Sequence, residues 1–167
     1  MTDETKSVQV KKVYDAPIQL VFDAWTRAEH VTKWMKCDAQ ATLDLEGWEP
    51  RVGATFKTRM ARGEQLIAAS TGRVLEVDAP TLFSYATDPM PQLGVGEMTV
   101  RIELREVDES TTELTLTHSG VPNDQICGFL EAGWGVSLEL LRDLVVALTG
   151  AYASARLARK EESKDAE

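Results

Sequence analysis

Hydrophobic and polar residues alternate near the start of the chain and again over a long central stretch. In residues 8–15, Val8, Val10 and Tyr14 share one face, as in a strand with one buried side. From Asp38 the two-residue period persists over most of about eighty residues. So much strand without intervening helices predicts an antiparallel sheet.

The central stretch divides into several strands at glycine, proline and charged turns. Strands are predicted over residues 53–61, 66–77, 81–87, 97–107 and 111–120. Gly63 supplies the positive φ of a tight turn between the first two. Gly72 is expected to form a bulge or bend. Parity places Phe56, Tyr85 and His118 on the inner face of the sheet.

Two short helices are expected between the first and second strands. Pro17 suits a helix N-terminus, and Ile18 and Trp25 follow helical spacing within residues 17–26. A second helix over residues 28–35 places Val31 and Trp34 on one side. The pair is expected to cap one end of the sheet.

A long amphipathic helix closes the chain. It begins with Asn123 or Asp124 as N-cap and ends near Gly150. About 26 residues span ~39 Å, more than a flat sheet needs as cover, so a curved sheet should wrap around the helix. Its apolar stripe consists of Ile126, Leu130, Trp134, Ser137, Leu141, Leu144, Val145 and Leu148.

These elements predict one α+β domain over residues 1–150 with the helix-grip fold. About six or seven antiparallel strands wrap around the C-terminal helix, and two short helices lie between strands 1 and 2. Residues 151–167 are expected to add a helical extension and a charged, disordered tail from residue 159.

Charge and composition exclude several classes of partner. The formal net charge is −9, from 27 acidic and 18 basic residues, and the basic residues are scattered. Nucleic acid and anionic membrane surfaces are therefore not expected partners. Neither a leader segment nor a membrane-spanning run is apparent, which predicts a cytoplasmic protein. Cys37 and Cys127 lack metal or redox spacing and are expected to stay reduced.

Four segments in this order resemble the Hsp90 ATPase activator homologues, a family of the START and Bet v 1-like (SRPBCC) superfamily. They are residues 16–26 leading to Trp34, residues 72–77, residues 113–119, and Gly133-Trp134-Gly135. The resemblance covers residues 8–148. It implies the order β-α-α-β(6)-α and a cavity between the sheet and the last helix.

Seven residues are expected to line that cavity as a ligand-binding site: Phe56, Tyr85, His118, Phe129, Trp134, Ser137 and Leu141. Three of these positions leave alternatives open. His118 either contacts a ligand or is satisfied by a neighbouring backbone group. Gly133 and Gly135 mark either close backbone packing or space kept free beside Trp134. The Ser137 hydroxyl either faces the cavity or bonds a carbonyl of its own helix.

The inner face offers little for catalysis. His118 and Ser119 are adjacent on a strand and point to opposite faces, so no catalytic triad is predicted. Of the two histidines, His118 is expected to face inward and His30 is expected on an exposed helix surface. We therefore predict no catalytic residues, no metal and no cofactor.

Three functions are compatible with this pattern. The first is a binding or carrier domain for an apolar or aromatic small molecule. The second is a cochaperone-like domain that contacts a chaperone. The third is a cyclase- or hydrolase-like enzyme with His118 as acid or base. Either a monomer or a homodimer is expected.

Overall fold

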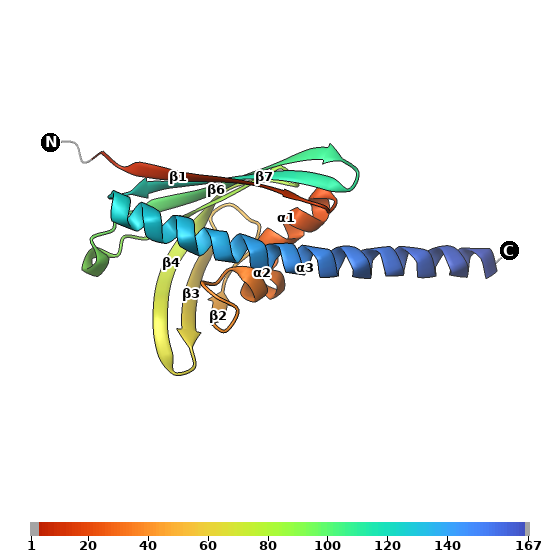
Figure 1. Cartoon of the computed structure of the whole chain (residues 1–167), viewed down its shortest axis with the longest axis horizontal. Coiled ribbons are helices and arrows are strands. Elements are labelled where there is room, and N and C mark those ends of the chain that lie inside the picture. The colour runs from red at the N-terminus through yellow and green to blue at the C-terminus, as the bar shows by residue number, and fades with distance from the viewer. Residues whose placement is uncertain (1–3, 166–167) are drawn as a thin grey trace.

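Seven strands and three α-helices make up the computed structural model, which describes residues 4–165 (Figure 1). In chain order the elements are β1 (Lys6–Tyr14), α1 (Ile18–Thr26), α2 (Ala28–Trp34), β2 (Thr42–Glu46), β3 (Thr55–Arg62), β4 (Gln65–Asp78), β5 (Leu82–Thr87), the 3₁₀ helix η1 (Pro91–Leu93), β6 (Met98–Asp108), β7 (Thr111–Val121) and α3 (Asp124–Asp165).

All the strands join in one antiparallel sheet with the order β1-β7-β6-β5-β4-β3-β2. Strands β2 to β7 pair with their neighbours in sequence, and β1 joins the far edge beside β7. Figure 1 shows β3 and β4 bending away from β1, β6 and β7, with α3 lying across the angle between them. This confirms the α+β helix-grip fold.

The register of β4 shifts at two places, and the predicted position, Gly72, is at neither. One shift lies where the pairing with β3 passes from Ala68 to Leu66, and the other lies between Val74 and Glu76. Gly72 is required for another reason: a Cβ there would lie 2.0 Å from the carbonyl oxygen of Ala86 and 2.6 Å from the ring of Phe56. The glycine therefore permits close approach of neighbouring strands and of an inner-face aromatic ring.

The two short helices cover one end of the sheet through their tryptophans, as predicted. Trp25 and Trp34 are fully buried and meet edge to face at 4.4 Å. The indole of Trp34 donates to the carbonyl oxygen of Ala24 at 2.8 Å, and that of Trp48 donates to Trp25 at 3.0 Å. These bonds link α1, α2 and the segment between β2 and β3.

Helix α3 begins as predicted and extends further than predicted. Asn123 is the N-cap, because its side-chain oxygen accepts from the amide of Ile126 at 3.0 Å. The helix continues past Gly150 to Asp165 and projects beyond the sheet (Figure 1). Residues 151–154 and 157–159 are exposed. Disorder of the charged end stays a prediction, and residues 166–167 lie outside the described part of the chain.

The buried face of α3 supports the predicted stripe and adds Leu138. Trp134, Ser137, Leu138, Leu141 and Val145 are all buried. They join the main core, to which all seven strands contribute side chains. The largest fully buried members of this core are Trp25, Trp34, Tyr14, Phe83, Ile102, Leu114, Leu116, Leu138 and Leu141. Within residues 4–165, none of the helices has the length and apolar character needed to cross a membrane.

Candidate functional site

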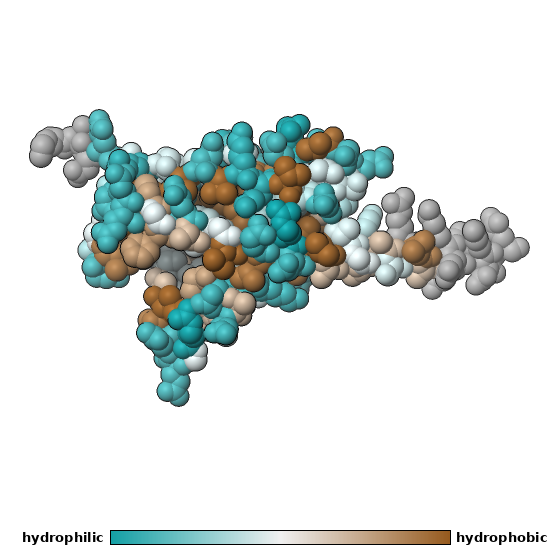
Figure 2. Space-filling view, viewed as in Figure 1, coloured by the Kyte–Doolittle hydropathy of each residue, from teal (hydrophilic) through white to brown (hydrophobic). Residues whose placement is uncertain are grey.

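A pocket of about 280 Å³ lies between the inner face of the sheet and the first half of α3. Figure 2 shows a hollow between α3 and the β3–β4 hairpin, with hydrophobic residues at its rim. The sheet side and the segment before β3 contribute Leu43, Trp48, Phe56, Thr58, Met60, Ala68, Ser70, Tyr85, Thr87 and His118. Helix α3 contributes Phe129, Leu130, Gly133, Trp134 and Ser137, and the segment after α2 contributes Met35, Lys36 and Cys37.

Strand register explains why distant residues meet in this pocket. Tyr85 on β5 pairs with Val100 on β6, and Val100 pairs with His118 on β7. Register partners share a face of the sheet, so all three side chains point inward. Thr87 follows Tyr85 on the same face. The parity predictions for Tyr85 and His118 are therefore confirmed.

His118 bonds a side chain of α3, not the backbone group that one of the two alternatives predicted. The Trp134 indole donates through Nε1 to Nδ1 of His118 at 3.0 Å. His118 is 5% exposed, and burial lowers its pKa to about 4. The ring is thus neutral at pH 7, and because Nδ1 accepts a hydrogen bond, its single proton lies on Nε2.

Two residues that line the pocket each have a buried polar atom without a hydrogen-bond partner among the described residues. Nε2 of His118 and Oγ1 of Thr87 are buried and have no hydrogen-bond partner among residues 4–165. Buried donors are nearly always paired, and an unpaired one costs free energy. Burial also raises the pKa of Tyr85 well above its usual range, so that its hydroxyl stays protonated. The pocket is therefore mainly apolar, with neutral polar groups at His118, Thr87 and Tyr85 and a charged one at Lys36, which is typical of small-molecule sites.

Aromatic rings form one wall of the pocket. Trp48 lies 4.9 Å from Phe56 and 5.0 Å from Tyr85, measured between ring centroids, in edge-to-face geometry. Phe56 and Tyr85 are 5.5 Å apart. Trp48 is not among the predicted lining residues, because it lies between β2 and β3, where strand alternation does not place a side chain. Its position depends on the bond from its indole to Trp25.

The predicted residues on α3 occupy three different environments. Trp134 and Ser137 are buried and line the pocket. Phe129 also lines it but is 70% exposed, which places this residue at the mouth. Leu141 is fully buried in the core and is not one of the lining residues. Six of the seven predicted residues therefore meet around one pocket, and their role in ligand binding stays a prediction.

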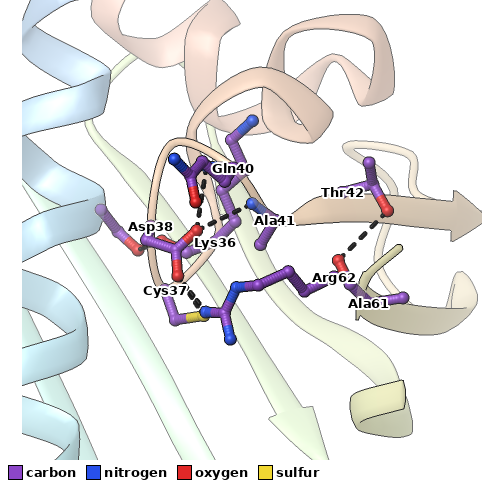
Figure 3. A network of polar contacts seen from close by, with 9 residues as sticks. Lys36, Cys37, Asp38, Gln40, Ala41, Thr42, Ala61 and Arg62 are labelled. Carbon is purple, nitrogen blue, oxygen red and sulfur yellow. Dashed lines mark hydrogen bonds and ion pairs between the residues drawn. The ribbon is translucent and has the colours of Figure 1, made fainter. Parts of the chain in front are cut away.

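Ser137 connects α3 to the segment that forms part of the mouth. Its hydroxyl donates to the carbonyl oxygen of Lys36 at 2.8 Å, not to its own helix as one alternative predicted. Figure 3 shows the adjoining network, in which Asp38 accepts from the amides of Gln40 at 2.9 Å and Ala41 at 2.8 Å. Arg62 at the β3–β4 turn also bonds Asp38, and this bond is the main reason that the pKa of Asp38 is lowered.

The glycines of α3 leave open space. A Cβ added at Gly133 or Gly135 would meet nothing within 4 Å, so the close packing expected there is wrong. Gly133 lines the pocket, whereas Gly135 does not. The other alternative, space kept free beside Trp134, therefore fits Gly133.

A wider hollow of about 720 Å³ lies along β2, β3 and β4. Its walls include Asp44, Glu46, Lys57 and Arg59, which alternate with the inner-face residues and carry both signs of charge. The unpartnered buried polar atoms of the described chain all lie elsewhere. The smaller pocket therefore has the stronger chemical features of a binding site.

Other candidate chemistry is sparse in the described chain. Residues 4–165 contain no group of three or more His, Cys, Asp or Glu side chains that could hold a metal ion. Ser119 accepts from Ser7 at 3.2 Å on the opposite face from His118. Cys37 and Cys127 are free thiols. His30 is half-buried, not exposed as predicted, and burial lowers its pKa.

An antiparallel sheet wrapped around a long helix, with an apolar pocket between them, defines a helix-grip domain. The family model for "Activator of Hsp90 ATPase homolog 1-like protein" matches residues 15–146. The chain therefore belongs to this family, as the sequence resemblance predicted. Comparison with curated proteins finds no match.

Solved structures share this fold at low sequence identity. A protein from Chromobacterium violaceum is 22% identical with a TM-score of 0.73, and the match covers 84% of this chain and 97% of that one. An AHSA1 protein from Silicibacter pomeroyi is 16% identical, with a TM-score of 0.72 and coverage of 85% and 99%. The Aha1 dimer from Colwellia psychrerythraea is 20% identical, with a TM-score of 0.67 and coverage of 84% and 96%.

Proposed function

We propose that the protein binds or carries a small apolar or aromatic molecule in the pocket between the sheet and α3. The observation that carries this proposal is an apolar pocket lined by His118, whose Nε2 is buried without a hydrogen-bond partner among residues 4–165. A volume of about 280 Å³ lies near the lower end of small-molecule sites. The ligand is therefore expected to be compact, of the size of one or two fused rings.

The predicted ligand contacts are Phe56, Tyr85, His118, Phe129, Trp134 and Ser137, with Leu141 packed behind them. The aromatic residues supply flat apolar surface, and His118 supplies a polar contact. Phe129 lies at the mouth because it is largely exposed. Binding without reaction is favoured because the described residues that line the pocket include no Asp or Glu to assist His118.

Amide chemical-shift perturbation by NMR tests the proposal. Addition of 2-acetylnaphthalene should shift the amide resonances of Phe129, Gly133 and Trp134, with saturation. Gly133→Leu should abolish the shifts by filling the pocket, whereas Gly135→Leu should not, since Gly135 does not line it. An absence of saturable shifts for this compound and a panel of one- and two-ring compounds would sink the proposal.

A cochaperone-like role is a second candidate function. It is favoured by the description of the matched family as similar to an Hsp90 ATPase activator. The test is the ATPase rate of a bacterial Hsp90 with and without this protein. An increased rate, retained in Gly133→Leu, would favour chaperone contact through a surface outside the pocket. An unchanged rate together with no recovery of Hsp90 in a pull-down would exclude it.

Location and oligomeric state follow as further proposals. We place the protein in the cytoplasm because both cysteines are free thiols. A monomer or a homodimer is expected, and one structurally similar protein is described as a dimer. Sedimentation equilibrium distinguishes the two states.

A further inference from the structure

We propose that Nε2–H of His118 donates a hydrogen bond to an oxygen acceptor of the ligand, so that the ligand is an uncharged apolar or aromatic molecule carrying a carbonyl or similar oxygen. This inference rests on the proposed function and narrows its ligand class. It depends on three observations. Nδ1 of His118 accepts a hydrogen bond. Nε2 is buried without a partner among residues 4–165, and the register partners of His118 are the uncharged residues Val8 and Val100.

Trp134 determines which nitrogen of His118 carries the proton. An indole N–H can only donate, so Nδ1 of His118, 3.0 Å away, must accept. The neutral imidazole then carries its proton on Nε2. The sheet and α3 thus hold the ring in one tautomer that presents a donor, and Trp134 acts as a positioning residue.

The donor has no partner of its own in the described part of the chain. Nε2 is buried without a hydrogen bond among residues 4–165, and the His118 side chain borders the pocket. A ligand oxygen that reaches Nε2 would pair this donor, whereas a hydrocarbon of the same shape would leave it unpaired. Sites of this kind discriminate against analogues that lack the matching polar atom.

The surroundings of His118 favour a neutral acceptor over a carboxylate. Its register partners on the adjoining strands are Val8 and Val100. Among the described residues that line the pocket, the charged one is Lys36, in the segment after α2. Val8 and Val100 supply no charge, so a carboxylate at Nε2 would depend on Lys36 for its counter-charge, whereas a neutral oxygen would need none.

Thr87 holds another buried polar atom, Oγ1, without a hydrogen-bond partner among residues 4–165, and it lies on a different strand from His118. Its strand, β5, is separated from β7 by β6, which places the two backbones about 10 Å apart at ordinary strand spacing. This separation allows the two contacts to be tested independently.

Paired ligands test the inference against the proposed function. Naphthalene and 2-acetylnaphthalene share an apolar ring system, and only the second carries a carbonyl. NMR titration of the full chain at pH 7 should show binding of both, with the ketone about tenfold tighter. Equal affinities would overturn the inference while leaving the binding proposal intact, and binding of neither compound would refute the binding proposal itself.

The histidine ring provides a readout that needs no substitution. Long-range ¹H–¹⁵N correlation spectra distinguish the two neutral tautomers, and His118→Gln identifies the signals of His118 against those of His30. The free protein should show the Nε2–H tautomer, and the ketone should shift Nε2 more than naphthalene does. An Nδ1–H tautomer, or no shift of Nε2 at saturation with the ketone, would overturn the inference.

Substitutions test whether His118 causes the preference for the ketone over naphthalene. His118→Phe should abolish the preference for the ketone, whereas His118→Gln should retain part of it because its amide can still donate. Thr117→Val, on the same strand and the opposite face, is the matched control. Loss of the preference in Thr87→Val but not in His118→Phe would move the contact to Thr87 and overturn the inference.

Discussion

His118 and Trp134 form a buried polar pair in an otherwise apolar site. One member comes from β7 and the other from α3, so their hydrogen bond joins the sheet to the helix that it grips. Burial favours the neutral imidazole, because the charged form would lose its hydration without gaining an ion pair. The pair therefore links fold stability to pH.

Stability should fall as the pH is lowered through the titration range of His118. The pKa is about 4 in the folded state against about 6.5 when unfolded, so the unfolded state binds more protons between these values. The contribution of His118 is present above pH 6.5 and is lost as the pH falls toward 4. From pH 7 to pH 5 the loss should be about 2 kcal/mol. Urea unfolding at the two pH values measures it.

His118→Gln is the control for this prediction, since other groups also titrate. Its stability should vary less between pH 7 and pH 5 than that of the wild type. Equal pH dependence in the two proteins would show that the His118 pKa is not depressed.

Substitutions at Phe129 and Leu141 should distinguish a pocket residue from a core residue. Leu141 is fully buried, so Leu141→Ala should cost about 2–5 kcal/mol of unfolding free energy. Phe129 is 70% exposed, and Phe129→Ala should cost less than about 0.5 kcal/mol. Binding of 2-acetylnaphthalene should nevertheless weaken in Phe129→Ala. Urea unfolding and NMR titration give the two readouts, and unchanged affinity in Phe129→Ala would remove this residue from the site.

At the scale of elements, α3 serves both the core and the pocket. Tyr14 on β1 donates to the carbonyl oxygen of Leu138 at 3.0 Å, and Ser137 donates to Lys36 at 2.8 Å. These bonds join α3 to β1 on one side and to the segment after α2 on the other. The glycines nearby weaken the same helix, because glycine is a poor helix former.

Gly133→Ala should stabilise the protein and impair the pocket. An alanine there meets nothing within 4 Å, so unfolding free energy should rise by up to about 1 kcal/mol. The added methyl group occupies pocket space, so affinity for 2-acetylnaphthalene should fall. Gly135→Ala is the matched control: thermal unfolding should show a similar gain, with affinity unchanged. Equal effects of both variants on affinity would contradict a specific role for Gly133.

At the scale of the whole molecule, the last part of α3 stands apart from the domain. Residues 151–154 and 157–159 are exposed, and the helix projects beyond the sheet (Figure 1). The core instead depends on residues up to Leu148, which packs against it. This arrangement supports the prediction that residues 1–150 form the folding unit.

Truncation after Gly150 should therefore leave the domain folded. The melting temperature should change by no more than about 3 °C, with a loss of helical circular dichroism in proportion to the residues removed. Truncation after Leu140, which removes Leu141 and Val145, should prevent cooperative unfolding because both are buried. A large loss of stability in the longer variant would assign the extension a structural role.

The sequence by itself determined most of the elements, but not β2 or the full length of α3, and it determined which side chains point inward from the main strands. Alternation placed Phe56, Tyr85 and His118 on one side of the sheet, and the helical period placed Trp134 and Ser137 on the buried side of α3. These patterns are local, because a strand repeats every two residues and a helix every 3.6. The fold class and most of the pocket lining followed from them.

Only the tertiary structure decided which partners these residues meet. The His118–Trp134 bond, the Ser137–Lys36 bond and the contact that requires Gly72 each join residues from different elements. Strand register and helix placement set such distances, and neither leaves a periodic trace in the chain. The unpartnered nitrogen of His118 belongs to the same category, because an unpaired group is recognised only when its whole surroundings are known.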